Sequence, residues 1–306
     1  MRPSVRTIAV TGGTGFVGAH LLRLARDAGI EVRALARGWK PPEDGLIWVE
    51  GSLERPDSLR RLIEGSDAVI HVAGLISGSR EAFEAVNVGG TAAMIDAARA
   101  AGVRRFVHVS SLAAREPELS AYGWSKARSE RLVAASGLDW TIIRPPAVYG
   151  PGDRETLELF RMARRGLVAL PPGGRFSLVH VEDLCRLILR VVAEPDTLAE
   201  LYEPDDGTEG GWDHRDFALA LGDALGRRTR ALALPRALLG GASRLDTLVR
   251  RKGAKLTPDR VRYFCHPDWV VAADRRPPKA LWSPQVGTAE GLRATGEWYR
   301  AEGWLR

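Results

Sequence analysis

The chain has 306 residues, of which 45% are hydrophobic and 27% charged, and 44 basic against 38 acidic side chains give a net charge of +6. These values are typical of a globular protein with enough apolar material for one large domain or two smaller ones. No apolar run approaches the roughly 18 to 20 residues that a membrane span needs, and we expect no signal peptide. Two cysteines, Cys185 and Cys265, exclude a disulfide framework and a metal site, so we expect free thiols in a cytoplasmic protein.

Most basic side chains lie beside acidic ones along the predicted helices, which is typical of solvated faces. One run departs from this pattern and contains Arg250, Arg251, Lys252, Lys255, Arg260 and Arg262. A nucleic-acid surface would need aromatic platforms among these cations, and the run offers few. We therefore expect no nucleic-acid partner.

The first predicted element is a short apolar strand over residues 6–10, followed by the segment TGGTGFVG at residues 11–18. The glycines let backbone N–H groups come close to a ligand, and a helix over 19–28 follows at once. The free N–H groups and the positive dipole end of such a helix favour an anion. Strand, glycine turn and helix in this order predict a site for the pyrophosphate of a dinucleotide.

Strands and helices alternate over the first half of the chain. Strands are predicted over 31–37, 45–50, 68–73, 106–111 and 140–144, and helices over 56–64, 82–102 and 122–136. Such alternation predicts an α/β fold with a doubly wound parallel sheet of the Rossmann type. Prolines and glycines cluster beyond residue 145. We therefore expect a dinucleotide-binding domain at 1–150 and a smaller substrate-binding lobe at 151–306, from which 176–192 returns to the sheet.

The segment YGWSK at 122–126 opens the helix that is predicted after the fifth strand. Residues four apart lie on one helix face, so the phenol of Tyr122 and the ammonium of Lys126 point the same way. A neighbouring cation favours the phenolate and lowers the phenol pKa, which would suit Tyr122 to acid–base catalysis near neutral pH. Ser110 and Ser111 end the preceding strand, where a hydroxyl can donate to a substrate carbonyl oxygen.

Several segments resemble the extended branch of the short-chain dehydrogenase/reductase superfamily. The glycine turn is similar to its TGxxGxxG pattern, and the tyrosine–lysine pair is similar to its YxxxK pattern. Further segments follow in the family's order: HVAG at 71–74, NVGGT at 87–91, RPPAVYGPGD at 144–153 and VHVEDL at 179–184. The resemblance implies a Ser-Tyr-Lys catalytic site, in which Ser111 rather than Ser110 takes the serine position.

The end of the second predicted strand bears on the choice between NAD and NADP. An acid about 20 residues after the glycines would accept hydrogen bonds from ribose hydroxyls, whereas an arginine can pair with a 2′-phosphate. The strand ends at Arg37, and the next carboxylate is Glu43. After the third strand, Ser52 stands where the family commonly has an aspartate for the adenine edge. These residues favour NADP(H) and leave NAD(H) open.

The motifs and the resemblance together imply two sets of site residues. The expected catalytic residues are Ser111, Tyr122 and Lys126. The expected cofactor contacts are Gly12, Thr14, Gly15, Phe16, Val17, Gly18, Arg37, Ser52, Leu53, Ala73, Gly74, Asn87, Tyr122, Lys126, Pro145 and Val148. Three histidines among apolar residues, His71, His108 and His180, are expected in the core without a chemical role.

We therefore expect hydride transfer between NADP(H) and a carbonyl or alcohol. Tyr122 would exchange the proton, Lys126 would tune it, and Ser111 would hold the substrate oxygen. The C-terminal segment resembles steroid and flavonol reductases of the family, which implies an apolar small-molecule substrate. Two alternatives stay open: a nucleotide-sugar epimerase with NAD, and an NADP(H)-binding sensor or assembly protein without turnover. A homodimer also stays open.

Overall fold

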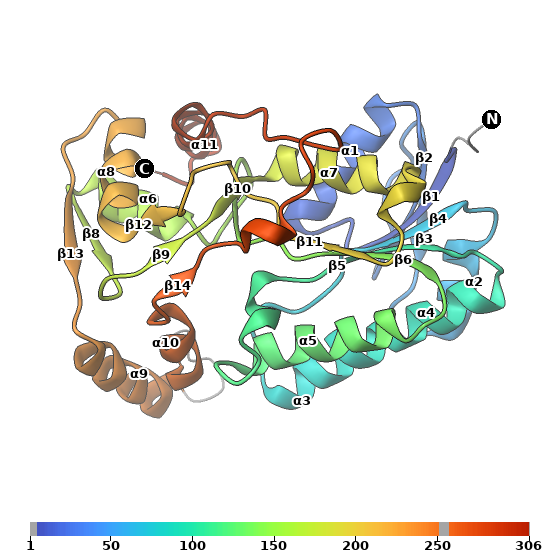
Figure 1. Ribbon diagram of the computed structural model, residues 1–306, viewed down its shortest axis with the longest axis horizontal. Helices are drawn as coiled ribbons and strands as arrows, with labels where there is room; N and C mark the ends of the chain where they lie inside the picture. The colour runs from blue at the N-terminus through green and yellow to red at the C-terminus, as the bar shows by residue number, and fades with distance from the viewer. Residues whose placement is uncertain (1–4, 251–256, 306) are drawn as a thin grey trace. The chain divides into compact units, whose positions relative to one another are not determined.

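The computed structural model describes residues 5–250 and 257–305 (Figure 1), and backbone contacts divide them into two compact units. Unit 1 contains the described residues up to Pro145, with Val181–Pro204 and Asp274–Ser283. Unit 2 contains the described residues of Pro146–His180, Asp205–Ala273 and Pro284–Arg306. The first unit thus ends before the expected boundary at 150, and the segments that return to it are 181–204 and 274–283, whereas 176–180 of the expected segment 176–192 belong to unit 2. One bond that links the Asp274–Ser283 segment to unit 1 runs from the Glu203 backbone N–H to the Arg275 carbonyl, at 2.8 Å.

Unit 1 is built on a seven-stranded sheet in which every pair of neighbours is parallel, in the order β11-β6-β5-β4-β1-β2-β3. The strands are β1 Thr7–Thr11, β2 Glu31–Ala36, β3 Leu46–Glu50, β4 Ala68–His71, β5 Arg105–Val109, β6 Asp139–Ile143 and β11 Glu200–Tyr202. Strands covered on both faces are apolar throughout, and Ile8, Ala9 and Val10 of β1 are fully buried. The predicted doubly wound α/β sheet is confirmed.

Helices cover both faces of this sheet (Figure 1). One face carries α1 Phe16–Asp27 against α7 Val181–Ala193. The other carries α2 Pro56–Ile63, α4 Gly90–Ala100 and α5 Ala121–Ala134, of which α4 contacts the other two. Beneath α2 and α4 lies a hydrophobic core, which includes Leu59, Leu62, Met94 and Phe106. Parallel strands place their carboxyl ends at one edge, so the residues that follow them share that edge.

The helix predicted over 82–102 is not continuous. It consists of α3 Arg80–Phe83, a wide π-type turn over Glu84–Gly89, and α4. Asn87 lies in the wide turn, and the Thr91 hydroxyl donates to its carbonyl at 2.6 Å. The turn therefore gives Asn87 a backbone environment that a regular helix does not offer, and such turns are frequent at functional sites.

Unit 2 has short strands and its own core. Its paired strands are β7 Ala147–Tyr149 with β10 Leu178–His180, β8 Leu167–Leu170 with β13 Arg230–Ala233, and β9 Arg175–Phe176 between β12 Trp212–Asp213 and β14 Asp268–Trp269. Its helices are α6 Leu157–Arg164, α8 His214–Ala224, α9 Arg236–Arg250, α10 Pro258–Phe264 and α11 Thr288–Ala301. Aromatic rings fill the core between them, among them Tyr149, Phe160, Phe217 and Tyr299.

Three short 3₁₀ segments complete the described structure: η2 Leu112–Arg115, η3 Pro195–Thr197 and η5 Ala273–Arg275. Three of the six basic residues in the run considered above, Arg251, Lys252 and Lys255, lie outside the described residues. Among the helices of residues 5–250 and 257–305, none is both long enough and apolar enough to cross a membrane.

Candidate functional site

The glycine turn between β1 and α1 is shaped by close backbone contacts. Gly12 has a φ of +77°, and a Cβ there would lie 2.7 Å from the backbone nitrogen of Ala73, beyond the end of β4. A Cβ on Gly18 would lie 2.0 Å from the carbonyl oxygen of Gly12. The Gly15 N–H donates to that same oxygen at 2.9 Å. Because no side chain fits at positions 12 and 18, the turn leaves a cradle that only glycines permit.

The N-terminus of α1 opens onto this cradle. Gly15 is the N-cap, and among the described side chains none caps the helix or places an acid in its first turn. Phe16 and Val17 follow as its first two residues, and Thr14 and Gly15 are exposed. Uncapped N–H groups at a helix N-terminus favour an anion. The turn therefore fits the pyrophosphate of a dinucleotide, which the sequence predicted.

The residues that follow β2 and β3 lie at the same edge of the sheet. Arg37 comes directly after β2 and is exposed. The first carboxylate after it, Glu43, is in an ion pair with Arg26 at 2.7 Å. After β3, the backbone N–H of Ser52 donates to the Ser58 hydroxyl, and Leu53 packs against α4. Because Glu43 is paired with Arg26, it does not neutralise the positive charge of Arg37 that was predicted at the end of β2.

The loop after β4 connects the glycine turn to α5. Ala73 donates its N–H to the Thr11 hydroxyl at 3.3 Å. Asn87 bonds both backbone groups of Leu75, at 2.7 and 3.1 Å, and donates to the Ser125 hydroxyl of α5 at 2.9 Å. These bonds place the predicted contacts Ala73, Gly74 and Asn87 together. A Cβ on Gly74 would lie 3.8 Å from the Lys126 Nζ, so this loop also adjoins the candidate catalytic residues.

Ser111, Tyr122 and Lys126 come together where β5 ends and α5 begins. Tyr122 is hydrogen-bonded to the Ser111 side chain. Ser111 Oγ also accepts the Ala113 N–H at 3.2 Å, as the N-cap of η2. Lys126 is 4% exposed and donates from Nζ to the Val109 carbonyl at 2.8 Å. The hydroxyl, the phenol and the ammonium therefore form one cluster, although they come from two separate elements.

Burial acts on the two titratable groups of this cluster in opposite directions. It raises the pKa of Tyr122, and the hydrogen bond with Ser111 opposes that rise. It lowers the pKa of Lys126 to about 8, and the charge of Glu130 opposes that fall. The sequence argument expected a lowered phenol pKa from the lysine alone. Burial instead sets the direction of the shift and raises the pKa, so the direction expected for Tyr122 is wrong.

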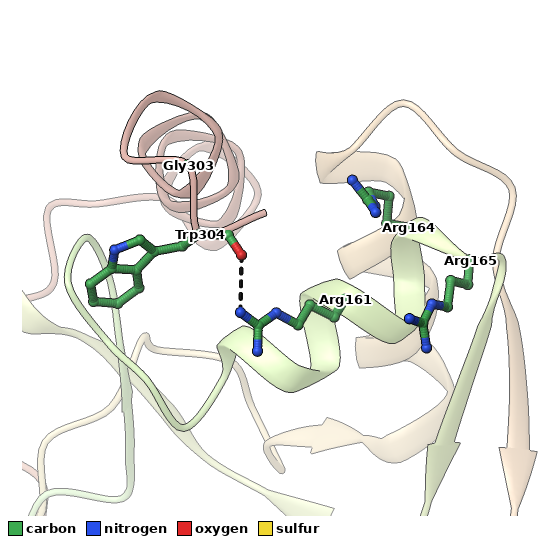
Figure 2. A pocket seen from close by; sticks show the side chains of 5 residues that line it. All are labelled: Arg161, Arg164, Arg165, Gly303 and Trp304. Carbon is green, nitrogen blue, oxygen red and sulfur yellow. Dashed lines mark hydrogen bonds between the residues drawn. The ribbon is translucent and has the colours of Figure 1, made fainter. Parts of the chain in front are cut away.

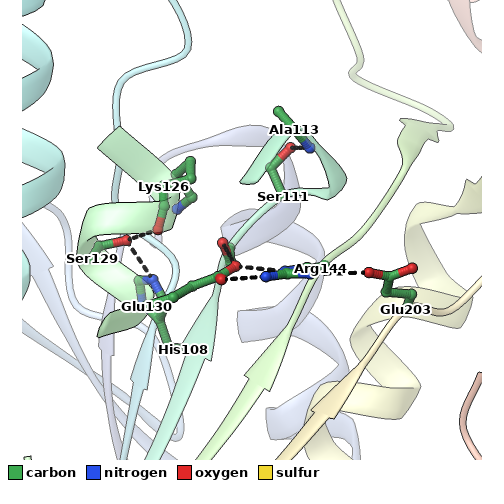
Figure 3. Close-up of polar contacts among 9 residues, drawn as sticks. His108, Ser111, Ala113, Lys126, Ser129, Glu130, Arg144 and Glu203 are labelled. Carbon is green, nitrogen blue, oxygen red and sulfur yellow. Dashed lines mark hydrogen bonds and ion pairs between the residues drawn. The ribbon is translucent and has the colours of Figure 1, made fainter. Parts of the chain in front are cut away.

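A buried charge network supports the cluster, and sequence reasoning missed it (Figure 3). Glu130 of α5 accepts two bonds from Arg144, at 2.9 and 2.7 Å, and a third from Ser110 at 2.5 Å. Arg144 also contacts Glu203, at 3.3 Å. The available signal was the spacing of α5, because Glu130 follows Lys126 by four residues on the same helix face.

The predicted core histidines of unit 1 lie beside this network. His71 bridges the Thr11 and Thr91 hydroxyls, at 2.7 and 3.1 Å, and stacks on His108 with ring centroids 5.5 Å apart. His108 bonds the Ser129 hydroxyl at 3.0 Å. Burial, with the nearby Lys126 cation, lowers the pKa of His71 to about 3 and that of His108 well below its usual value. Both rings are therefore neutral near pH 7.

The last two predicted cofactor contacts, Pro145 and Val148, are not part of the Ser111–Tyr122–Lys126 cluster. Pro145 accepts the Leu112 N–H at 2.9 Å and so anchors the segment after Ser111. Val148 lies on β7, in unit 2. Unit 2 also has a cavity of about 350 Å³, which contains none of the predicted site residues (Figure 2). Its lining is Arg161, Arg164, Arg165, Gly303 and Trp304.

Known proteins resemble this chain over most of its length. Residues 8–203 match the NAD dependent epimerase/dehydratase family. Ceramide reductase of Caulobacter vibrioides is 37% identical over 311 residues, covering 97% of this chain and 96% of that protein. Sterol demethylase protein B of Methylococcus capsulatus is 31% identical over 345 residues, covering 98% and 100%. A solved structure, MoeE5 in complex with UDP-glucose and NAD, has a TM-score of 0.74 at 23% identity, covering 97% and 99%. The chain therefore belongs to the NAD-dependent epimerase/dehydratase family.

Proposed function

We propose that this protein is an NADPH-dependent reductase that converts a carbonyl group of an apolar substrate to an alcohol. One observation carries the proposal, the cluster of Ser111, Tyr122 and Lys126. It combines a hydroxyl bonded to a phenol with a buried ammonium four residues further along the same helix. The hydroxyl and the phenol can both bind one carbonyl oxygen, and the phenol can give it a proton.

The residues of the cluster divide the work of reduction. The bound cofactor would supply a hydride to the carbonyl carbon and leave as NADP⁺. Ser111 donates a hydrogen bond to the carbonyl oxygen, and Tyr122 transfers its phenolic proton to that oxygen as the π bond opens. The product is the alcohol, and water returns a proton to Tyr122. Lys126 stabilises the phenolate in the interval. Burial, which raises the pKa of Tyr122, keeps the phenol protonated at neutral pH, as a proton donor requires.

Two features support NADPH as the cofactor. The glycine turn and the uncapped N-terminus of α1 suit a pyrophosphate. Arg37 would pair with the 2′-phosphate, because it is exposed at the end of β2. Glu43 is paired with Arg26, so it is not available to repel that phosphate or to bind the ribose hydroxyls in its place.

The relatives support an apolar substrate. Ceramide reductase and sterol demethylase protein B match nearly the full length of this chain, and their names refer to lipids. We infer that the substrate is a lipid ketone, such as a ceramide analogue with a ketone in place of one hydroxyl. The C-terminal resemblance to steroid and flavonol reductases favours the same class.

Oxidation of NADPH with a panel of lipid ketones, sugar nucleotides and simple aldehydes tests the proposal. We expect turnover with a lipid ketone and a loss of about a hundredfold or more in kcat for Tyr122→Phe, because the variant has no proton to transfer. NADPH affinity should change little. Tyr202→Phe on β11 is the matched control and should keep full activity. Equal activity of Tyr122→Phe and the wild type would exclude this mechanism.

An NAD-dependent sugar-nucleotide epimerase is the second candidate, because MoeE5 is described with UDP-glucose and NAD and shares the fold. Interconversion of UDP-sugars without net consumption of cofactor would favour it over the reductase. Tight NADPH binding without turnover of any panel member would instead favour a sensor or assembly protein. The intact tyrosine–lysine pair supports an enzyme over that third reading.

A further inference from the structure

We propose that Glu130 is a positioning residue of this site: clamped by Arg144, its carboxylate stabilises the cation of Lys126 and fixes the serine segment that carries Ser111. The proposal rests on the proposed function, because it assigns Glu130 to the same Ser-Tyr-Lys cluster. Glu130 touches neither the substrate oxygen nor the proton donor. It acts through its neighbours.

The carboxylate of Glu130 is fully engaged in a buried position. The residue is 6% exposed and lies one turn beyond Lys126 on α5. One oxygen accepts the Ser110 hydroxyl at 2.5 Å and the Arg144 Nε at 2.9 Å, and the other accepts the Arg144 Nη2 at 2.7 Å. A two-pronged guanidinium contact fixes the plane of a carboxylate as well as its position. Figure 3 shows Glu130 between the Lys126 region and Arg144.

The bond from Ser110 links Glu130 to the candidate catalytic serine. Ser110 also donates its backbone N–H to the Ile143 carbonyl at 2.7 Å, and Leu112 donates to the Pro145 carbonyl at 2.9 Å. Ser111 lies between these two anchored residues. Loss of the Ser110 side-chain bond therefore frees one of the constraints on the Ser111 hydroxyl, and small displacements of a reacting group lower rates strongly.

The charges of the network balance. Lys126 and Arg144 are cations, Glu130 and Glu203 are carboxylates, and the Glu203 side chain is 1% exposed. Removing the charge of Glu130 leaves an excess positive charge in a buried region, where it is costly. Lys126 can relieve that excess by losing a proton, whereas a guanidinium does not lose one near neutral pH.

Three elements around Lys126 contribute polar or titratable groups. β4 contributes His71, β5 contributes His108 and the Val109 carbonyl, and α5 contributes Tyr122 and Glu130. The histidines are neutral near pH 7 because their pKa values are lowered, and the phenol is neutral because its pKa is raised. Glu130 is thus the group in this set that raises the pKa of Lys126 and so favours its protonated form. The pKa of about 8 for Lys126 already includes the charge of Glu130, which opposes the effect of burial, so loss of Glu130 moves this pKa further toward neutral pH.

Binding of NADPH as a function of pH, followed by cofactor fluorescence on the full chain, tests the charge role. In the wild type, affinity should fall as pH rises through about 8, where Lys126 loses its proton. In Glu130→Gln the same fall should occur at least about one pH unit lower, which makes binding about threefold weaker midway between the two midpoints and approaches about tenfold above them. Glu130→Asp keeps the charge and should restore most of the shift. Glu158→Gln, which removes an exposed carboxylate of α6, should leave the curve unchanged.

Ser110→Ala tests the positioning role and does not depend on how Glu130→Gln folds. It removes one hydroxyl and no charge, so kcat should fall about tenfold while the pH midpoint of NADPH binding stays in place. Equal midpoints for the wild type and Glu130→Gln, or an unchanged kcat for Ser110→Ala, would overturn the proposal and leave the reductase intact. A wild type that binds no NADPH at any pH would overturn the proposed function itself, and the role of Glu130 with it.

Discussion

The glycine turn and the α5 cluster belong to the same unit but are built in opposite ways. At the turn, Gly12 and Gly18 are required because a Cβ would collide with backbone atoms. In the cluster, Lys126 and Glu130 are required because buried partners depend on their side-chain atoms. The turn thus requires residues without a Cβ atom, whereas the cluster requires the charged side-chain groups of particular residues. Substitutions should therefore act sterically in the first region and electrostatically in the second.

Gly18→Ala should have the largest effect. Its Cβ would lie 2.0 Å from the Gly12 carbonyl oxygen, a backbone atom that cannot turn aside as a flexible side chain can. We expect NADPH affinity to fall by about a hundredfold or more and the unfolding free energy to fall by about 3 kcal/mol. The control is Gly38→Ala, where a Cβ would meet no atom within 4 Å. Titration with NADPH and urea unfolding measure both effects. Normal binding by Gly18→Ala would show that the turn has room to adjust.

The second largest effect should be a pH dependence of stability that arises near the α5 cluster and not at the glycine turn. The neutral rings of His71 and His108 are buried, with the pKa of His71 lowered to about 3 from 6.5. Below pH 6.5 the unfolded chain takes up protons that the folded protein does not, so stability must fall as the pH falls. The two histidines together should lower the unfolding free energy by about 2 kcal/mol as the pH falls from 6.5 to about 5.5.

Urea unfolding at several pH values measures this slope. His108→Gln should remove about half of it, whereas His266→Gln, on a less buried histidine of unit 2, should leave it unchanged. An equal slope in all three proteins would mean that other groups set the acid stability. The glycine turn contributes no titratable side chain between Thr11 and Gly18, so Gly18→Ala should lower the whole curve without changing its slope.

Much of the fold and part of the site could be predicted from sequence because the signals are local. The buried strands are short apolar runs, and the pairing of Tyr122 with Lys126 follows from helix spacing. The wide turn at Glu84–Gly89 could not be predicted, since its sequence EAVNVG contains no proline and is equally compatible with a regular helix. The network could not be predicted either, because Arg144 and Glu203 are 59 residues apart in sequence. Contacts of this kind depend on the strand order of the sheet, which local periodicity does not determine.

Substitution of Arg37 should have the smallest effect on cofactor affinity. It also allows binding of NADPH and of NADH to be compared in the same variant. Arg37 is an exposed side chain at the end of β2, so we expect its contribution to binding to be electrostatic, unlike the steric role of Gly12 and Gly18. Arg37→Gln should weaken NADPH about tenfold and leave NADH nearly unchanged, because only NADPH carries a 2′-phosphate. The NADPH effect should shrink at high salt, since exposed charges are screened. Arg215→Gln, on an exposed arginine of unit 2, is the matched control. If Arg37→Gln weakens both cofactors equally, the arginine contacts a part that they share, and the preference for NADPH must come from another residue.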